Sequence, residues 1–224
     1  MSQDLWEREY VNHSISSSTN TRPSHGTEFL RQCLPRIAEV SGPPRLLDLG
    51  CGGGRNIEVL EETGLGFYGM DFALRPLAAA RARKGGRTLR LVQGSMAEPL
   101  PFKTGIFSIV TAFTAVENIV EDRQLRQLGE QVRRVLCPDG LFYVYFLTTD
   151  DTYYQPLVSR GSDGRCLTYD PVTELRQRVY RLNELCELFS PSFELLTSAE
   201  FTFQDTRSNG TWERRLAAGL WKRD

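Results

Sequence analysis

Glycines at alternate positions follow a short apolar run near residue 50. The run from Leu46 to Leu49 leads directly into Gly50, Gly52 and Gly54, and a helical pattern comes next. Small residues let the backbone turn sharply and approach a ligand closely, and the first amides of a helix stand free to donate hydrogen bonds to a polar group. The pattern predicts a ligand-binding turn between a strand and a helix.

A carboxylate, Asp71, follows 21 residues after Gly50, at the expected end of the next strand. A carboxylate at this spacing can accept hydrogen bonds from both hydroxyls of a ribose. The motif begins at Asp48 and reads D-x-G-x-G-x-G, whereas dinucleotide sites have the pattern G-x-G-x-x-G. These residues together favour a nucleoside ligand without a pyrophosphate. A tight connection that binds nothing is the alternative explanation of the glycines alone.

Short apolar strands alternate with helical patterns around this turn, which predicts an α/β fold with helices on both faces of a sheet. The predicted parallel strands are 45–49, 67–70, 89–93, 106–113 and 141–147. Two more, 193–203 and 211–222, are expected to close the sheet as an antiparallel pair. Helices are predicted up to Glu62, from Leu74 to Gly85, and around the apolar positions of 125–135 and 182–189. The segments 13–24 and 148–169 are expected to be lids or binding loops.

Composition narrows the class of protein. The chain has 27 basic and 28 acidic residues, and this balance argues against nucleic-acid binding, which needs an excess of Lys and Arg. It has neither an apolar run of about 18 residues nor a secretory leader pattern, so no membrane partner and a cytoplasmic location are expected. Its five cysteines include no C-x-x-C pair, and therefore neither a disulfide framework nor a metal site is predicted.

The stretch from Leu46 to Leu147 resembles the class I methyltransferases, especially the small-molecule enzymes related to ubiquinone and menaquinone biosynthesis. The resemblance is carried by five pieces in order, namely 48–54, 69–71, 94–96 with 100–102, 107–113 and 136–140. It implies a Rossmann-like, doubly wound, mostly parallel seven-stranded sheet. It also implies S-adenosyl-L-methionine as the methyl donor, with S-adenosyl-L-homocysteine as product. We expect an N-terminal lid segment and helix over 1–40 and a methyltransferase domain over 41–224, together forming one structural domain.

The resemblance also assigns cofactor-binding residues. Asp48, Gly50, Cys51 and Gly52 are expected to bind the methionine part, and Asp71 the ribose. Phe72, Gly94, Ser95 and Met96 are expected to contact the adenine. Tyr10, Arg22 and Phe113 complete the expected site, with Arg22 as a partner of the cofactor carboxylate. Ser95 and Ser108 depart from the family, in which an acid is usual at both positions. A neutral serine accepts more weakly than a carboxylate, so a lowered cofactor affinity is expected.

Residues just after strands four and five should face the reacting methyl group, because ligands of such sheets lie beyond the carboxyl ends of the strands. These residues are 114–118 and 148–154. Where the acceptor must lose a proton, the candidate bases are His13, His25 and Glu117. Solvated imidazoles and a Glu that holds a loop are the plainer alternatives. An aromatic wall of Trp6, Tyr10, Tyr153 and Tyr154 is a further expectation, with lid packing as its alternative.

The sequence thus predicts methyl transfer to an oxygen, nitrogen or carbon nucleophile of a small molecule, a secondary metabolite being one candidate. A macromolecular acceptor, protein or RNA, is the first alternative, and the basic run from Arg75 to Arg90 would then line its groove. The second alternative is a non-catalytic nucleoside-binding module in which Ser95 and Ser108 mark decay of the site. The acceptor and the oligomeric state do not follow from the sequence.

Overall fold

Neighbouring side chains of the central strands are buried in two different cores. In β1 (Arg45–Leu49), Leu46 packs in one apolar cluster and Leu47 in the other. In β4 (Phe107–Phe113), every residue is buried, and Ile109 and Val110 divide in the same way. Because successive side chains of a strand point to opposite faces, such strands need helices on both sides of the sheet. The apolar runs predicted as doubly covered strands are confirmed.

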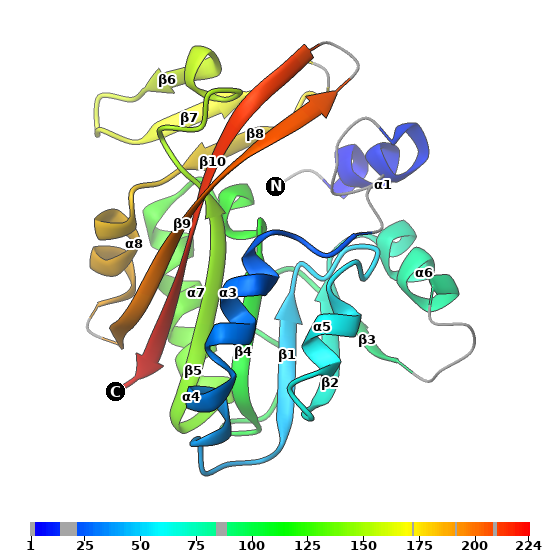
Figure 1. Ribbon diagram of the computed structural model, residues 1–224, viewed down its shortest axis with the longest axis vertical. Helices are drawn as coiled ribbons and strands as arrows, with labels where there is room; N and C mark the ends of the chain where they lie inside the picture. Colours follow the sequence, from blue (N-terminus) through cyan, green and yellow to red (C-terminus); the bar gives the residue numbers. More distant parts are fainter. Residues whose placement is uncertain (1–2, 14–21, 84–88, 172, 191, 208–209) are drawn as a thin grey trace.

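The computed structural model describes residues 3–13, 22–83, 89–171, 173–190, 192–207 and 210–224. Its elements (Figure 1) are α1 Gln3–Asn12, α3 Gly26–Gln32, α4 Leu34–Ala38, β1, α5 Ile57–Glu61, β2 Gly66–Asp71, α6 Leu74–Arg83, β3 Arg90–Gln93, β4, η1 Val116–Asn118, α7 Asp122–Val135, β5 Leu136–Leu147, η2 Gln155–Leu157, β6 Val158–Arg160, β7 Cys166–Tyr169, β8 Arg176–Val179, α8 Leu182–Phe189, β9 Phe193–Arg207 and β10 Gly210–Arg223.

The main sheet has the strand order β3-β2-β1-β4-β5-β10-β9. Its first five strands are parallel, whereas β10 pairs antiparallel with β5 and with β9. Strand order reverses between β1 and β4, so the connections that follow these two strands diverge and leave a crevice at the carboxyl edge. The predicted doubly wound, mostly parallel sheet of seven strands with its antiparallel C-terminal pair is confirmed.

The two faces of the sheet are covered by helices from different parts of the chain. The N-terminal helices α3, α4 and α5 pack in one cluster through residues such as Leu30, Ile37 and Leu60. Helices α7 and α8 pack in the other, where Leu125 and Val132 lie on the buried side of α7. Their helical spacing is what predicted α7. Helix α1 belongs to neither layer and lies beside α6 at the carboxyl edge (Figure 1).

A second, three-stranded antiparallel sheet, β6-β7-β8, was not anticipated from the sequence. The segment 148–169, predicted to be a loop, contributes η2, β6 and β7. These strands are only three or four residues long and carry little apolar alternation, so they give no strand signal. A buried carboxylate fixes the start of the segment, since Asp151 accepts hydrogen bonds from the amides of Tyr153 and Tyr154 and forms an ion pair with Arg214 of β10.

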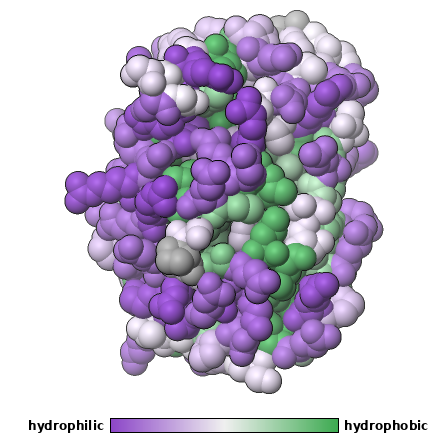
Figure 2. Space-filling view, turned by 90° about the vertical axis from the view of Figure 1, so that its left-hand side faces the viewer, coloured by the Kyte–Doolittle hydropathy of each residue, from purple (hydrophilic) through white to green (hydrophobic). Residues whose placement is uncertain are grey.

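The side of the molecule on which α8 and β9 lie is mostly hydrophilic, and apolar side chains gather near its middle (Figure 2). Along β9 half-buried residues such as Phe201 and Phe203 alternate with exposed ones such as Thr202 and Gln204. An edge strand of this kind keeps its apolar face against the protein and its polar face toward water. Within the described ranges, no helix combines the length and apolar character needed to cross a membrane.

Candidate active site

The turn between β1 and α5 depends on its glycines. Gly50, Gly52 and Gly54 have φ values of 68°, 53° and 74°, a region that other residues rarely adopt. Gly50 also lacks space for a side chain, because a Cβ there would lie 2.7 Å from the Cβ of Ala115. The alternating glycines read from the sequence therefore build the bend that brings the backbone to the carboxyl edge of the sheet.

Two amides of this turn already have partners, which differs from the expectation of free donors. The amide of Gly52 donates to Oδ2 of Asp71 (2.9 Å), and that of Gly53 donates to the hydroxyl of Tyr10 (2.7 Å). A backbone N–H removed from water needs an acceptor, and these two side chains provide it. Recognition of a ligand at the turn is left chiefly to the surrounding side chains.

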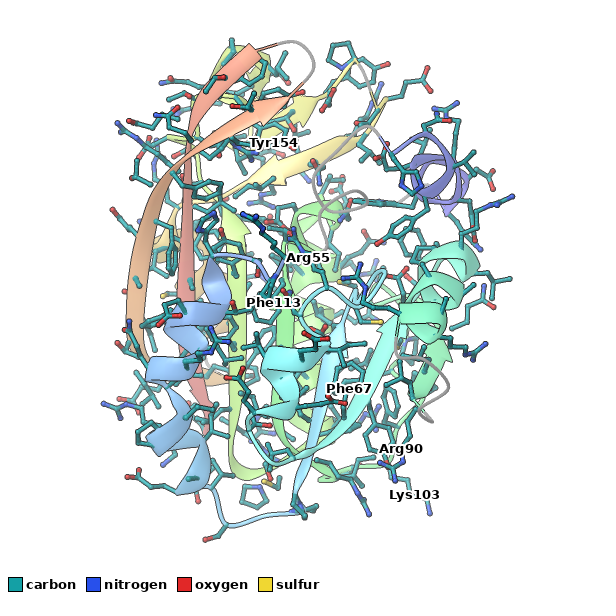
Figure 3. All side chains as sticks on the ribbon, turned by 45° about the vertical axis from the view of Figure 1, so that its right-hand side comes forward. Arg55, Phe67, Arg90, Lys103, Phe113 and Tyr154 are labelled. Atoms are coloured by element: carbon teal, nitrogen blue, oxygen red, sulfur yellow. The ribbon has the colours of Figure 1, made fainter. Side chains whose placement is uncertain are left out.

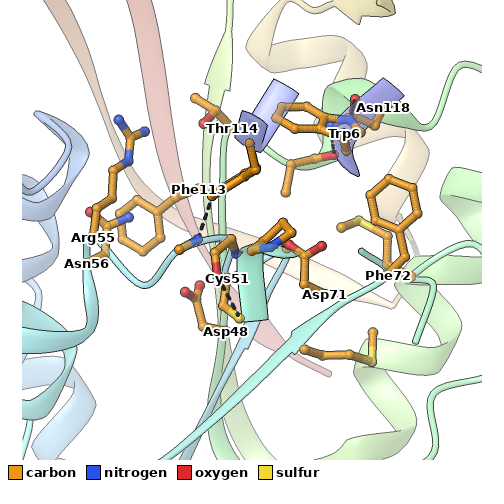
Figure 4. A pocket seen from close by; sticks show the side chains of 18 of the residues that line it. Trp6, Asp48, Cys51, Arg55, Asn56, Asp71, Phe72, Phe113, Thr114 and Asn118 are labelled. Atoms are coloured by element: carbon orange, nitrogen blue, oxygen red, sulfur yellow. Dashed lines mark hydrogen bonds between the residues drawn. The ribbon is translucent and has the colours of Figure 1, made fainter. Parts of the chain in front are cut away.

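A first cavity lies where β1, β2 and β4 end (Figure 4) and measures about 720 Å³, its open mouth included. Asp48 and Asp71 line it, as do Trp6 and Tyr10 of α1. Every residue predicted to bind the cofactor lines this cavity except Arg22 and Ser95. Its position beyond the carboxyl ends of the strands is the one expected for a nucleoside ligand.

The two acids of the first cavity are deeply placed. Asp48 is 3% exposed, and Oδ1 accepts a hydrogen bond from Thr111 (2.8 Å). Burial raises its pKa to about 7. Burial also raises the pKa of Asp71 to about 6, against the lowering effect of the Ala73 and Gly52 amides. A positively charged ligand would stabilise both carboxylates, so the cavity favours a cation.

Helix α1 is tied across the first cavity by polar contacts to three separate elements. Nε1 of Trp6 donates to Oδ1 of Asn118 (3.2 Å), which ends η1. The Glu7 carboxylate accepts from the Leu74 and Arg75 amides at the start of α6, a helix terminus that attracts negative charge. Tyr10 completes the set at the glycine turn. The predicted N-terminal range 1–40 also contains α3 and α4, which pack on the sheet instead. Residues 1–2 and 14–21 of this range lie outside the described residues.

A second cavity of about 1070 Å³, open mouth included, adjoins the first and shares Trp6, Arg55 and Thr114 with it. Its walls come from Thr114 after β4, from the C-terminal ends of β5 and β9 and from the N-terminal part of β10. Thr114 connects β4 to this region with φ of 47°, an uncommon value for a β-branched residue. The carboxyl ends of strands four and five were predicted to face the reacting group, and Tyr145 and Leu147 join the lining here.

The three candidate bases lie in different environments. His25 lines the second cavity and stacks on Phe203, with ring centroids 3.9 Å apart. Burial, followed by the nearby Arg55 cation, lowers its pKa, so the imidazole is neutral at pH 7. His13 is exposed, directly follows α1 and lines neither cavity.

Glu117 is fully buried and also lines neither cavity. Its Oε1 accepts from the amide of Leu147 (2.7 Å), and burial raises its pKa to about 8. This carboxyl group is therefore mostly protonated at neutral pH and holds the end of β5. Only His25 of the three lies where an acceptor could reach it.

Several other predicted features take positions away from the two cavities. Ser95 accepts a hydrogen bond from the Ala97 amide, and Ser108 donates to the carbonyl of Pro43 at the other end of β4. Tyr154 lines the second cavity, whereas Tyr153 donates a hydrogen bond to Asp170 and packs on Trp212. No described member of the basic run 75–90 lines either cavity, and Lys84 and Arg87 lie outside the described residues.

Sequence reasoning missed Arg55, which lines both cavities, and Arg22 appears in the second cavity although it was assigned to the first. The position of Arg55 directly after Gly54 was an available signal. Phe203 and Arg214 had none, because their place depends on β9 and β10 reaching the carboxyl edge. Among the residues that the structure describes, no group of three or more His, Cys, Asp and Glu is arranged to hold a metal ion.

Residues 47–144 match the methyltransferase domain family. The chain is 32% identical over 138 residues to an uncharacterized methyltransferase of Synechocystis, covering 61% of this chain and 63% of the relative. It is 33% identical over 132 residues to the ubiquinone biosynthesis O-methyltransferase of Cronobacter sakazakii, covering 57% of this chain and 51% of that protein. The matches thus span between half and two thirds of these relatives' lengths.

A solved structure of a methyltransferase from Anabaena variabilis, described as dependent on S-adenosylmethionine, has the same fold. It superposes with a TM-score of 0.67 at 18% identity and covers 99% of this chain and 95% of that one. The domain match spans the glycine turn, both cavity acids and the sheet from within β1 to within β5. Residues 47–144 thus match the methyltransferase domain family, and the chain has the fold of solved S-adenosylmethionine-dependent methyltransferases.

Proposed function

We propose that the protein transfers a methyl group from S-adenosylmethionine to an oxygen, nitrogen or carbon atom of a small molecule. One observation carries the proposal: an acidic cavity at the glycine turn adjoins a second cavity, and the two share the lining residues Trp6, Arg55 and Thr114. Two adjoining cavities can hold a donor and an acceptor side by side, and such alignment supplies much of the rate of a displacement reaction.

The residues of the first cavity fit this cofactor by charge and shape. S-adenosylmethionine supplies a methyl group bound to a positively charged sulfur. We assign the ammonium group of its amino-acid part to Asp48, the ribose hydroxyls to Asp71 and the flanks of adenine to Phe72 and Met96, all of which line this cavity. The burial that raises the pKa of both acids favours a ligand of net positive charge.

The protein itself would position the two reactants, close the first cavity with α1 and accept one proton from the acceptor. Helix α1 excludes water from the first cavity through its contacts with Asn118, Gly53 and the start of α6. Water exclusion strengthens electrostatic interactions within a site. His25, neutral at pH 7, would take a proton from an acceptor that must lose one. His13 and Glu117 would then have no role in proton transfer.

Support for a small acceptor comes from the second cavity, whose lining combines residues of β5, β9 and β10 with Trp6 of α1. Relatives named as ubiquinone biosynthesis O-methyltransferases point in the same direction. The described part of the basic run 75–90 lies away from both cavities and therefore does not support a nucleic-acid acceptor.

Calorimetry with S-adenosylhomocysteine and an assay with tritiated methyl donor test the proposal. We expect saturable binding that Asp71→Asn weakens at least tenfold, whereas Glu130→Gln on the exposed side of α7 leaves it unchanged. Thermal unfolding of both variants checks that they fold. In the assay a cell extract is split by ultrafiltration, and label should enter the small-molecule fraction. Label found only in the retained macromolecules, or no binding by the unmodified protein, would refute the proposal.

A further inference from the structure

The two cavities differ in the charged side chains that line them. The first contains the carboxylates of Asp48 and Asp71 with Arg55 at its border. The described lining of the second contains three guanidinium groups, Arg22, Arg55 and Arg214, against one carboxylate, Asp205. The first thus suits a cationic cofactor, and the second suits an anion where a guanidinium group has no protein carboxylate beside it.

Arg214 and Arg55 differ in how their charges are balanced. Arg214 is paired with Asp151 at 2.8 Å and with Asp205 at 2.9 Å, so protein carboxylates already neutralise it. Arg55 makes no hydrogen bond or ion pair with any of the described residues, although burial lowers the pKa of its guanidinium. An arginine keeps its charge even so, and a charge withdrawn from water is stable only beside a counter-charge. Arg55 is therefore the cation that a ligand would have to match.

The direction of Arg55 indicates which ligand this is. Its guanidinium points away from Asp48 and toward the level of Thr114 (Figure 4). In the wider view Arg55 lies between Phe113, at the end of β4, and Tyr154, which lines only the second cavity (Figure 3). The charged group is thus turned toward the acceptor side of the border between the cavities.

The same side is lined by flat side chains. Trp6, Tyr145, Tyr154 and Phe203 form walls, and His25 stacks on Phe203 with 26° between the ring planes. Planar ligands pack well between such walls, because offset-stacked and edge-to-face ring arrangements are both favourable. A planar carboxylate also matches the fork of a guanidinium with two parallel hydrogen bonds.

Resting on the proposed function, we infer that the methyl acceptor is a small aromatic carboxylate whose carboxylate group pairs with Arg55 while its ring lies between Trp6, Tyr154 and Phe203. The unmatched guanidinium of Arg55 and the flat walls are independent observations, and both lead to this class of molecule.

The test compares matched aromatic acids and amides, which share shape but differ in charge. Isothermal titration of the protein saturated with S-adenosylhomocysteine would use 3,4-dihydroxybenzoate with 3,4-dihydroxybenzamide, and 2-naphthoate with 2-naphthamide. We expect each acid that binds to exceed its amide at least tenfold, the difference expected for one charge-assisted hydrogen bond. Arg55→Met should abolish this preference and leave affinity for S-adenosylhomocysteine unchanged, Arg55→Lys should retain part of it, and Arg215→Met, at an exposed arginine, should not alter it.

Three results would overturn the inference: equal binding of acid and amide, no binding of either acid, or a loss of S-adenosylhomocysteine affinity in Arg55→Met, which would assign Arg55 to the cofactor. If Arg55→Met does not fold, the comparison of acid with amide binding by the unmodified protein and by Arg55→Lys still tests the inference. Failure of the unmodified protein to bind S-adenosylhomocysteine would instead refute the proposed function.

Discussion

Replacing Asp48 by Asn separates the stability of the protein from its affinity for the cofactor. Burial raises the pKa of Asp48 from 3.8 to about 7, so its ionised form is disfavoured in the folded protein. The group costs no stability below pH 3.8, where it is protonated both folded and unfolded. The cost grows as pH rises, because the unfolded chain ionises first, and it is complete above pH 7. At 1.36 kcal/mol per pKa unit the cost amounts to about 4 kcal/mol.

Asn has nearly the same size as Asp, and its oxygen can still accept the hydrogen bond from Thr111. We therefore expect Asp48→Asn to be more stable than the unmodified protein at pH 8, by up to about 4 kcal/mol, and to differ little at pH 4. Affinity for S-adenosylhomocysteine should fall at least tenfold, because the ammonium group loses its partner.

Urea unfolding of both proteins at pH 4, 6 and 8, without ligand, measures the stability difference, and calorimetry at pH 8 measures affinity. Effects of other titrating groups largely cancel in the comparison between the two proteins. A destabilised variant at pH 8, or a stability difference independent of pH, would show that Asp48 is not held as a buried, disfavoured anion.

Three other changes test separate parts of the structure. Arg214→Met should cost about 3–5 kcal/mol in urea unfolding, since it leaves Asp151 buried without its cation; exposed Arg215→Met is the control and should change stability little, and equal effects would contradict the buried pair. Tyr10→Phe should cost about 1–3 kcal/mol and speed hydrogen exchange at the Gly53 amide, which loses its acceptor; unchanged exchange there would disprove this contact. Once an acceptor is known, kcat/KM should rise with pH to a plateau, and the midpoint of the rise should lie below 6.5, the ordinary pKa of histidine, because the pKa of His25 is lowered. His25→Asn should lower the plateau value about 100-fold or more and remove this rise with pH.

The main sheet was predictable because its signals are local. The apolar runs of β1 and β4, the glycine turn and the helical spacing of Leu125, Leu128 and Val132 each fit one kind of element. The cofactor cavity follows from the same locality, since its turn and acids stand at the ends of neighbouring parallel strands.

The second cavity could not be predicted, because it arises from pairing across long stretches of chain. Phe203 and Arg214 reach the site only through the register of β9 with β10, which places them opposite each other. The sheet β6-β7-β8 depends similarly on Asp151, whose partner Arg214 is 63 residues away. Polar residues buried by distant pairing leave no periodic trace in a sequence, and local motifs can locate the donor side of such a site but not its acceptor side.

Trp6 of α1 lines both cavities, so a movement of this helix would affect turnover. One movement of the helix, breaking its contacts with Asn118, Gly53 and α6, would uncover the two cavities together. Methylated product and spent cofactor would then leave through a shared exit in a single opening, and the rate of that opening would set a common upper limit on the release of both.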